Sequence, residues 1–376
     1  MMKRITALLL VLCLLLCGCG AQAEPTQATQ EPISLDALIA ANGRAPETVE
    51  SNVTETTAAT EATTVPTEPE LCFNPLNGEV LEEPFTGRLY ASTVSNMQEN
   101  MPHVNLVKAD VVMEMYVNMN NIVRCLALFS DIESVKAIGS TRSTRPIFND
   151  IAQHYSLILS HAGGSDTALN DAADRGVENL NVENWDVMQV ATTSYRDTEY
   201  NRSLENSLFA IGSGIQAYAQ AQGWPMEMSK DYGLRFTENG TPADGEDATH
   251  ISLTFAYKEA KKDTKMIYDA DLGKYVWNQY GQEMTDQISG EKEAFTNVII
   301  MLTQISNEGL YHQADFLAGG EGYYANGGKI VPITWICDGD TEPFRFFTTD
   351  GAELELGMGN SYIAIAPTGS PVSWEA

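Results

Sequence analysis

Segments with strand and helix patterns alternate between residues 88 and 175, and this order limits the folds open to the chain. Strands are predicted over 88–95, 109–117, 122–129 and 156–160. Helices are predicted over 147–155 and 167–175, the second capped by Ser165 or Asp166 and ended by Gly176. A further helix is expected over 204–222. This alternation favours an α/β layer.

The second half of the chain changes to strand patterns separated by turn signals. Ile251, Leu253 and Phe255 alternate with small or polar residues, and turn sequences occur at 271–273 and 326–328. A long apolar strand is expected over 295–305. We predict an α/β N-terminal domain followed by a mostly antiparallel β C-terminal domain, α+β overall. The predicted domain boundaries are 71–235 and 246–376.

Four aromatic residues of the second half admit two interpretations. They are Tyr323, Tyr324, Trp335 and Phe346. They could line a carbohydrate platform, although packing in a core is the commoner use of such side chains.

The N-terminus has the pattern of a secretory signal. Two basic residues, Lys3 and Arg4, precede an apolar run over 5–16, and Cys19 follows Leu16-Cys17-Gly18. A cysteine in this setting resembles the bacterial lipobox. We therefore expect residues 1–18 to be a lipoprotein signal peptide and Cys19 to carry the lipid. The protein would then be anchored to the bacterial cell membrane and face outside the cytoplasm.

Residues 19–70 have a composition that does not support a packed core. The segment is rich in Thr, Ala, Glu and Pro, lacks aromatic residues, and contains Arg44 as its one basic residue. Such a segment buries too little apolar surface to offset the entropy lost on ordering. We expect a disordered acidic tether.

Charge and cysteine content restrict the partners. The net charge is −29, so nucleic acid, which needs a basic surface, is an unsuitable partner. Cys72, Cys125 and Cys337 form no Cys-x-x-Cys pair, and the sequence leaves open whether any two form a disulfide. For Cys125, within an apolar run, a buried position is expected. We predict neither a cofactor nor a metal.

Three polar features stand out in the first half and define a candidate ligand site. The first is an arginine loop before a helix, the second a glycine loop after a strand, and the third the alternate face of strand 109–117. Arginine binds carboxylate or phosphate in a fork geometry, and glycines let backbone approach a ligand. The candidate residues are Asp110, Glu114, Arg124, Arg142, Arg145, His161, Gly163, Gly164 and Ser165.

A purely structural interpretation competes with this one. Arg142 and Arg145 could pair with Asp110 and Glu114 in a buried network, and His161 could be a hydrogen-bonded structural histidine. The chain carries neither a His-Glu-x-x-His nor a Gly-x-Ser-x-Gly motif. The sequence assigns no catalytic residue.

The chain resembles a known family over about residues 71 to 370. The resemblance rests on Asn-Pro-Leu-Asn-Gly-Glu at 74–79, Gly-Ser-Thr-Arg-Ser-Thr-Arg-Pro at 139–146, His-Ala-Gly-Gly-Ser at 161–165 and Pro-Ile-Thr-Trp at 332–335. These motifs are similar to those of the YerB-like bacterial lipoproteins, a two-domain family of unknown function. The family usually has a histidine near residue 206, where this chain has Glu205-Asn206-Ser207. A weaker likeness, to the LytR-CpsA-Psr wall-polymer ligases, rests on the order Asp110, Arg142, Arg145.

Two functions are compatible with these observations. The first is a non-catalytic lipoprotein of the cell surface that binds an anionic envelope component or a partner protein. The second is an envelope enzyme, a phosphotransferase or hydrolase acting on phosphate-linked wall glycan. In the second, Asp110 or Glu114 would act as base or metal ligand, and Arg142 with Arg145 would stabilise phosphate charge.

Overall fold

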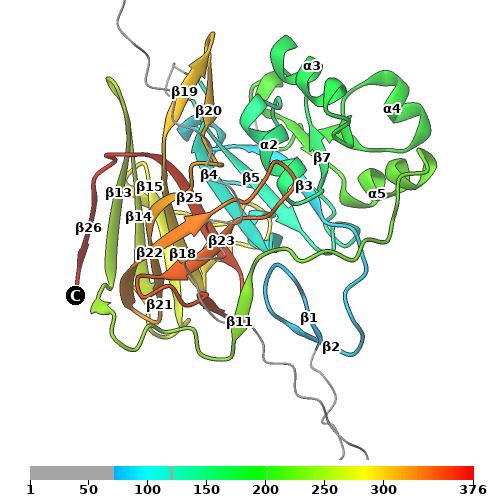
Figure 1. Ribbon diagram of the computed structural model, residues 1–376. Helices are drawn as coiled ribbons and strands as arrows, with labels where there is room; N and C mark the ends of the chain where they lie inside the picture. The colour runs from blue at the N-terminus through cyan, green and yellow to red at the C-terminus, as the bar shows by residue number, and fades with distance from the viewer. Residues whose placement is uncertain (1–71, 119–121, 201) are drawn as a thin grey trace, which may run out of the picture. The chain divides into compact units, whose positions relative to one another are not determined.

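The computed structural model describes residues 72–118, 122–200 and 202–376 (Figure 1). The predicted signal peptide, Cys19 and the tether lie outside these ranges. Within the described ranges, no helix has both the length and the apolar character needed to cross a bilayer. The predicted fold class is confirmed: an α/β segment is followed by mostly antiparallel β structure.

The central element is an eleven-stranded sheet, ordered β12-β22-β21-β18-β25-β4-β5-β3-β7-β8, with β23 paired to β22. Its strands from the first half are β3 (Tyr90–Ser95), β4 (Val111–Tyr116), β5 (Val123–Phe129), β7 (Ile158–His161) and β8 (Asn179–Asn181). Its strands from the second half are β12 (Glu246–Asp247), β18 (Asn297–Thr303), β21 (Gly320–Asn326), β22 (Lys329–Ile336), β23 (Arg345–Thr348) and β25 (Ser361–Pro367).

The two halves of the chain meet inside this sheet. Strand β25 pairs in parallel with β4, with Ser361 opposite Val111, and β4 pairs antiparallel with β5. The cyan strands β4 and β5 therefore lie beside red β25 in Figure 1. Strand β25 therefore joins the second half of the chain to the first.

A second, six-stranded sheet has the order β16-β15-β14-β13-β26, with β17 paired to β15. Its strands are β13 (His250–Tyr257), β14 (Ala260–Asp269), β15 (Lys274–Gln279), β16 (Gln282–Glu283), β17 (Ala294–Phe295) and β26 (Val372–Glu375). The smaller pairs are β1 (Cys72–Phe73) with β2 (Val80–Leu81), β11 (Arg235–Thr237) with β24 (Glu355–Gly357), and β19 (Ile305–Glu308) with β20 (Tyr311–Ala314).

The helices are short and belong to the first half. They are α2 (Pro146–His154), α3 (Asp166–Asp174), α4 (Trp185–Val190) and α5 (Gly212–Ala221), with short 3-10 turns η1 (Gln98–Asn100), η2 (Leu106–Lys108) and η3 (Leu204–Asn206). A three-stranded sheet of β6 (Ile138–Gly139), β10 (Leu208–Ala210) and β9 (Ser194–Arg196) lies among them in sequence.

Two boundary predictions were wrong. The helix expected over 204–222 is η3, then β10, then α5, because 208–210 pairs with β6 and β9 on either side. The long strand expected over 295–305 is divided into the end of β17, β18 and the start of β19. In both cases pairing with distant segments overrides the local apolar pattern.

Both faces of the central sheet are buried at β4, β5 and β25. From β4, Val112 and Tyr116 belong to a core with Ile251 and Trp277 of the six-stranded sheet. The alternate residues Val111, Met113 and Met115 belong to a second core with Phe148 of α2. Because the six-stranded sheet covers the face that carries Glu114, this face is not the open polar surface that the alternation suggested.

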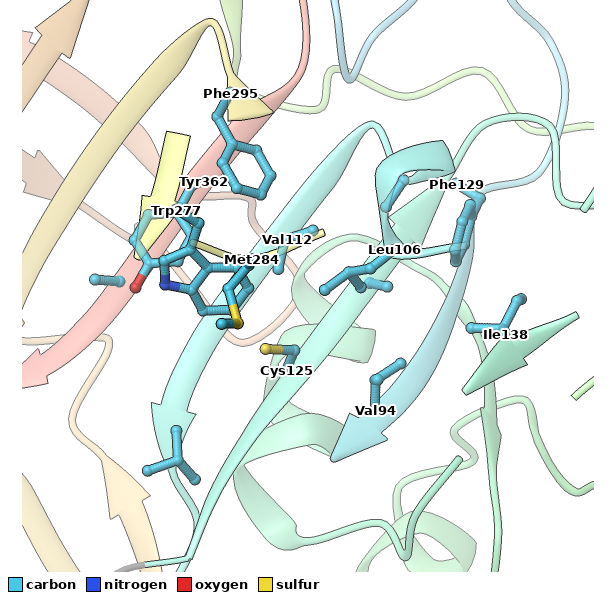
Figure 2. Close-up of a cluster of buried hydrophobic side chains, with 14 of the residues drawn as sticks. Val94, Leu106, Val112, Cys125, Phe129, Ile138, Trp277, Met284, Phe295 and Tyr362 are labelled. Carbon is cyan, nitrogen blue, oxygen red and sulfur yellow. The ribbon is translucent and has the colours of Figure 1, made fainter. Parts of the chain in front are cut away.

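The first core also settles the role of Cys125. Its side chain is fully buried and lies on β5 near Val112, Met284 and Trp277 (Figure 2). Burial raises the pKa of this thiol well above its ordinary value. Within the described residues, Cys125 and Cys337 form no disulfide.

Three of the four aromatic residues belong to the second core, as the packing interpretation expected, and Tyr323 packs against the first core. Tyr324, Trp335 and Phe346 are buried, and Trp335 packs against Phe344 with ring centroids 5.9 Å apart. A fourth ring in this core is His154, at the end of α2, whose Nδ1 lies 3.4 Å from the sulfur of Cys337. These rings form packing contacts and do not present a carbohydrate surface.

Candidate functional site

The arginine loop runs from β6 to α2. Pro146 occupies the first turn of α2, where its missing N–H costs nothing, and Arg145 precedes it in an extended conformation. The N–H of Thr141 donates to the carbonyl of Leu208, 2.9 Å away, so β10 holds the start of the loop. The loop is therefore fixed at both ends by regular structure.

The glycine loop lies directly against the arginine loop. The N–H of Ala162 donates to the carbonyl of Arg142 (2.9 Å), and the N–H of Thr144 donates to the carbonyl of Gly163 (3.0 Å). Gly163 has φ of 68°, a conformation that favours glycine. Ser165 caps α3 by accepting the N–H of Ala168 at 3.2 Å, as predicted. The two loops singled out in the sequence are thus brought together.

Three guanidinium groups converge at these loops. Arg124, on β5, is 4% exposed, and its Nη1 donates to the carbonyl of Ser143 at 2.6 Å. Burial lowers the pKa of Arg124 well below its usual range, and the charges of Arg145 and Arg142 lower it further. Ser143 lies between Arg142 and Arg145, so this contact brings the Arg124 guanidinium to the loop that carries the other two. We call Arg124, Arg142 and Arg145 the arginine cluster.

The partners of the cluster come from elsewhere in the chain. Arg142 forms an ion pair with Glu205 of η3 and donates to its carbonyl at 2.7 Å. The guanidinium carbon of Arg145 lies 5.0 Å from the ring centroid of Tyr311, on β20. The Nε of Arg145 is buried without a hydrogen-bond partner among the described residues. Among those residues, Glu205 is the one carboxylate ion-paired with the cluster.

His161 has a structural place under the glycine loop. The ring is 1% exposed, with Nδ1 2.7 Å from the carbonyl of Gly163 and Nε2 3.0 Å from Oδ1 of Asn179. Burial lowers its pKa. Both ring nitrogens have local hydrogen-bond partners, so this histidine orders the loop. Gly164 is also packed, since a side chain there would meet Leu169.

Asp110 lies away from the arginine cluster. Its carboxylate accepts hydrogen bonds from Nδ2 of Asn77 (2.6 Å) and from the N–H and Oγ of Ser130 (both 2.7 Å). Burial raises its pKa, although these bonds oppose the shift. Ser130 follows β5 and Arg124 stands near its start, so about 20 Å of strand separates the two sites.

Glu114 has no contact with an arginine either. It is fully buried between the two large sheets and accepts from Asn96 (2.7 Å), Thr264 (3.0 Å), Lys262 and Tyr362. Nζ of Lys262 also lies 5.6 Å from the Trp277 ring centroid. The network expected between these acids and Arg142 or Arg145 is therefore absent from the described residues. Acids of the neighbouring strands do not neutralise the cluster.

Sequence reasoning missed two members of the site. Glu205 was noted only as a departure from the family pattern, because residues 204–222 were expected to be helical. Tyr311 lies over 160 residues beyond Arg145 in the chain, and no local pattern indicates their contact. No group of three or more metal-binding side chains occurs in the described part of the chain.

Comparison with known proteins supports the fold and the family. No curated protein matches the chain. The crystal structure of YerB protein from Bacillus subtilis is similar, with a TM-score of 0.67 and 20% sequence identity, over 80% of this chain and 99% of that one. Residues 76–225 match the N-terminal domain, and residues 252–363 the C-terminal domain, of "Protein of unknown function (DUF3048)". The chain therefore belongs to this two-domain, YerB-like family of unknown function.

Proposed function

We propose that this protein is a non-catalytic, lipid-anchored envelope protein whose arginine cluster binds an anionic group of an envelope component or partner protein. The observation that supports this most is the charge balance of the cluster. Three guanidinium groups share a single carboxylate, on a chain of net charge −29. A local positive site on a chain with a negative net charge is suited to a negative ligand.

Glu205 acts as a displaceable counter-ion in this proposal. Its side chain is 76% exposed, whereas that of Arg142 is 17% exposed. An exposed ion pair contributes little to stability, so an incoming phosphate or carboxylate can replace Glu205 at small cost.

The candidate acid–base groups do not support the alternative of an envelope enzyme. Asp110 and Glu114 lie outside the cluster, and His161 is held by Gly163 and Asn179. General acid–base catalysis needs the transferring group within hydrogen-bond reach of the substrate. Binding is therefore the function that the geometry supports best.

Opposite effects are expected from changing the two partners of the exposed ion pair. Arg142→Gln should weaken binding of glycerol phosphate or glucuronate at least about tenfold, because a charge-assisted hydrogen bond is lost. Glu205→Gln should tighten it several-fold, because the competing carboxylate is gone. Isothermal titration calorimetry of the purified protein in low-salt buffer measures the affinity of both variants.

The matched control is Arg235→Gln, an arginine ion-paired elsewhere on the surface, which should not alter binding. Equal affinities in the wild type and Arg142→Gln, or no saturable binding of either probe, would overturn the assignment. The enzyme alternative would instead be supported if the wild type released phosphate from glycerol phosphate and the Arg142→Gln variant did not. ³¹P NMR measures this release.

The anchoring part of the proposal rests on Cys19. Cys19→Ala should move the expressed protein from the membrane fraction to the culture medium, because a lipidated thiol is the proposed attachment. Fractionation and immunoblotting measure the shift, with Cys17→Ala as the control. Retention of the Cys19→Ala variant in the membrane, with its signal peptide removed, would exclude this anchor.

A further inference from the structure

A cleft separate from the arginine cluster lies where η2 and the start of β4 face the β14–β15 turn. Its volume is about 760 Å³, within the range of small-molecule sites. Its lining combines apolar side chains, Val107 and Leu272 among them, with lysines and carboxylates. The cleft includes Asp110, whose partner Ser130 lies about 20 Å along β5 from Arg124 of the arginine cluster.

Lys274 supplies an incompletely paired positive charge in this cleft. Its Nζ donates to Oδ1 of Asn360 at 3.0 Å, and within the described residues it forms no ion pair. Burial lowers its pKa, with the charge of Glu291 opposing the shift. An ammonium group has three donors, so two are available to an anionic ligand atom.

Asp110 supplies the complementary negative charge. Three donors from Asn77 and Ser130 fix its carboxylate, which has about four acceptor positions. One position is therefore left for a donor from the cleft. The carboxylate is also held rigidly, and a rigid acceptor loses little entropy on binding.

We propose that this cleft binds a small zwitterion, an amino acid or short peptide with free termini. The ligand carboxylate pairs with Lys274, its ammonium group donates to Asp110, and Leu272 contacts its apolar side chain. None of the twelve lining residues is aromatic, so the cleft lacks the flat rings on which a sugar stacks. A ligand with both charges matches the two groups at once.

The test uses the whole mature chain with L-alanyl-L-alanine and L-leucyl-L-leucine, each also N-acetylated or C-amidated. Calorimetry should show saturable binding of at least one free dipeptide. Blocking either terminus should weaken its binding at least about tenfold. Lys274→Met should have the same effect as C-amidation, and Lys274→Arg should retain binding because it keeps the charge.

Lys265→Met is the matched control, because Lys265 is an exposed lysine of the same sheet. Arg142→Gln should leave dipeptide binding unchanged. The proposal for this cleft and the proposal for the arginine cluster are therefore tested independently. The proposal is overturned if no dipeptide binds, if the blocked forms bind as well as the free ones, or if a correctly folded Lys274→Met variant retains full affinity.

Discussion

Glu114→Ala is expected to lower the free energy of unfolding by about 3–5 kcal/mol. The substitution leaves Lys262, whose side chain is 6% exposed, without its counter-charge between two sheets. It also removes the acceptor for Thr264 and Tyr362. Burial already lowers the pKa of Lys262, so the uncompensated ammonium is costly to keep. Equilibrium urea denaturation followed by tryptophan fluorescence measures the loss.

A double-mutant cycle separates the lost ion pair from the lost packing. Glu114→Leu combined with Lys262→Met removes both charges and fills most of the space, so it should cost less than the two single changes added together. Glu259→Ala, at an exposed turn position, should stay within about 0.5 kcal/mol of the wild type. A loss below about 1 kcal/mol for Glu114→Ala would show that water reaches Lys262.

The location of Glu114 shows what the sequence could and could not predict. Period-two alternation over 109–117 correctly predicted a strand and correctly separated its two sets of residues. The same alternation suggested that the Glu114 face was open. Lys262, its partner, lies 148 residues later in the chain. A local pattern shows that a carboxylate sits on one face, and only tertiary structure shows what covers that face.

The central sheet is subject to the same limit. Local patterns predicted β3, β4, β5 and β7 near their observed places, because such patterns depend on neighbouring residues. The parallel pairing of β25 with β4 joins residues about 250 positions apart. Such pairings depend on the loop entropy and the packing of the whole chain. The continuity of the sheet across both halves was therefore outside the reach of sequence reasoning.

The candidate site was predicted in part, and for a physical reason. The arginine loop and the glycine loop each connect a strand to a helix, and such loops meet at one edge of an α/β layer. The two loops do meet, through backbone contacts at Arg142, Thr144 and Gly163, although the strands before them, β6 and β7, belong to different sheets. Asp110 and Glu114 were grouped with them only by chemical type. The positions of Asp110 and Glu114 along their strand, which the sequence also shows, argue against that grouping.

Acidification should destabilise the protein partly through His154. Burial between Phe316, Phe344 and Cys337 lowers the pKa of His154 to about 4. The unfolded chain takes up this proton as the pH falls through about 6.5, whereas the native protein does so only near 4. The contribution to stability is therefore complete above pH 6.5 and is lost as the pH falls towards 4. At pH 5 the expected loss is roughly 2 kcal/mol.

His154→Leu should remove that pH-dependent part while keeping an apolar side chain among the aromatic rings. Urea titrations at pH 7 and pH 5 give the free energy of unfolding for each protein, and the difference between the two pH values should be roughly 2 kcal/mol smaller in the variant. His250→Leu, at an exposed position, should leave the difference unchanged. Equal losses in His154→Leu and the wild type would mean that the native protein protonates His154 as readily as the unfolded chain. The α2 end would then have to open to water above pH 5, and the packing of His154 against Cys337 would not persist in mildly acidic solution.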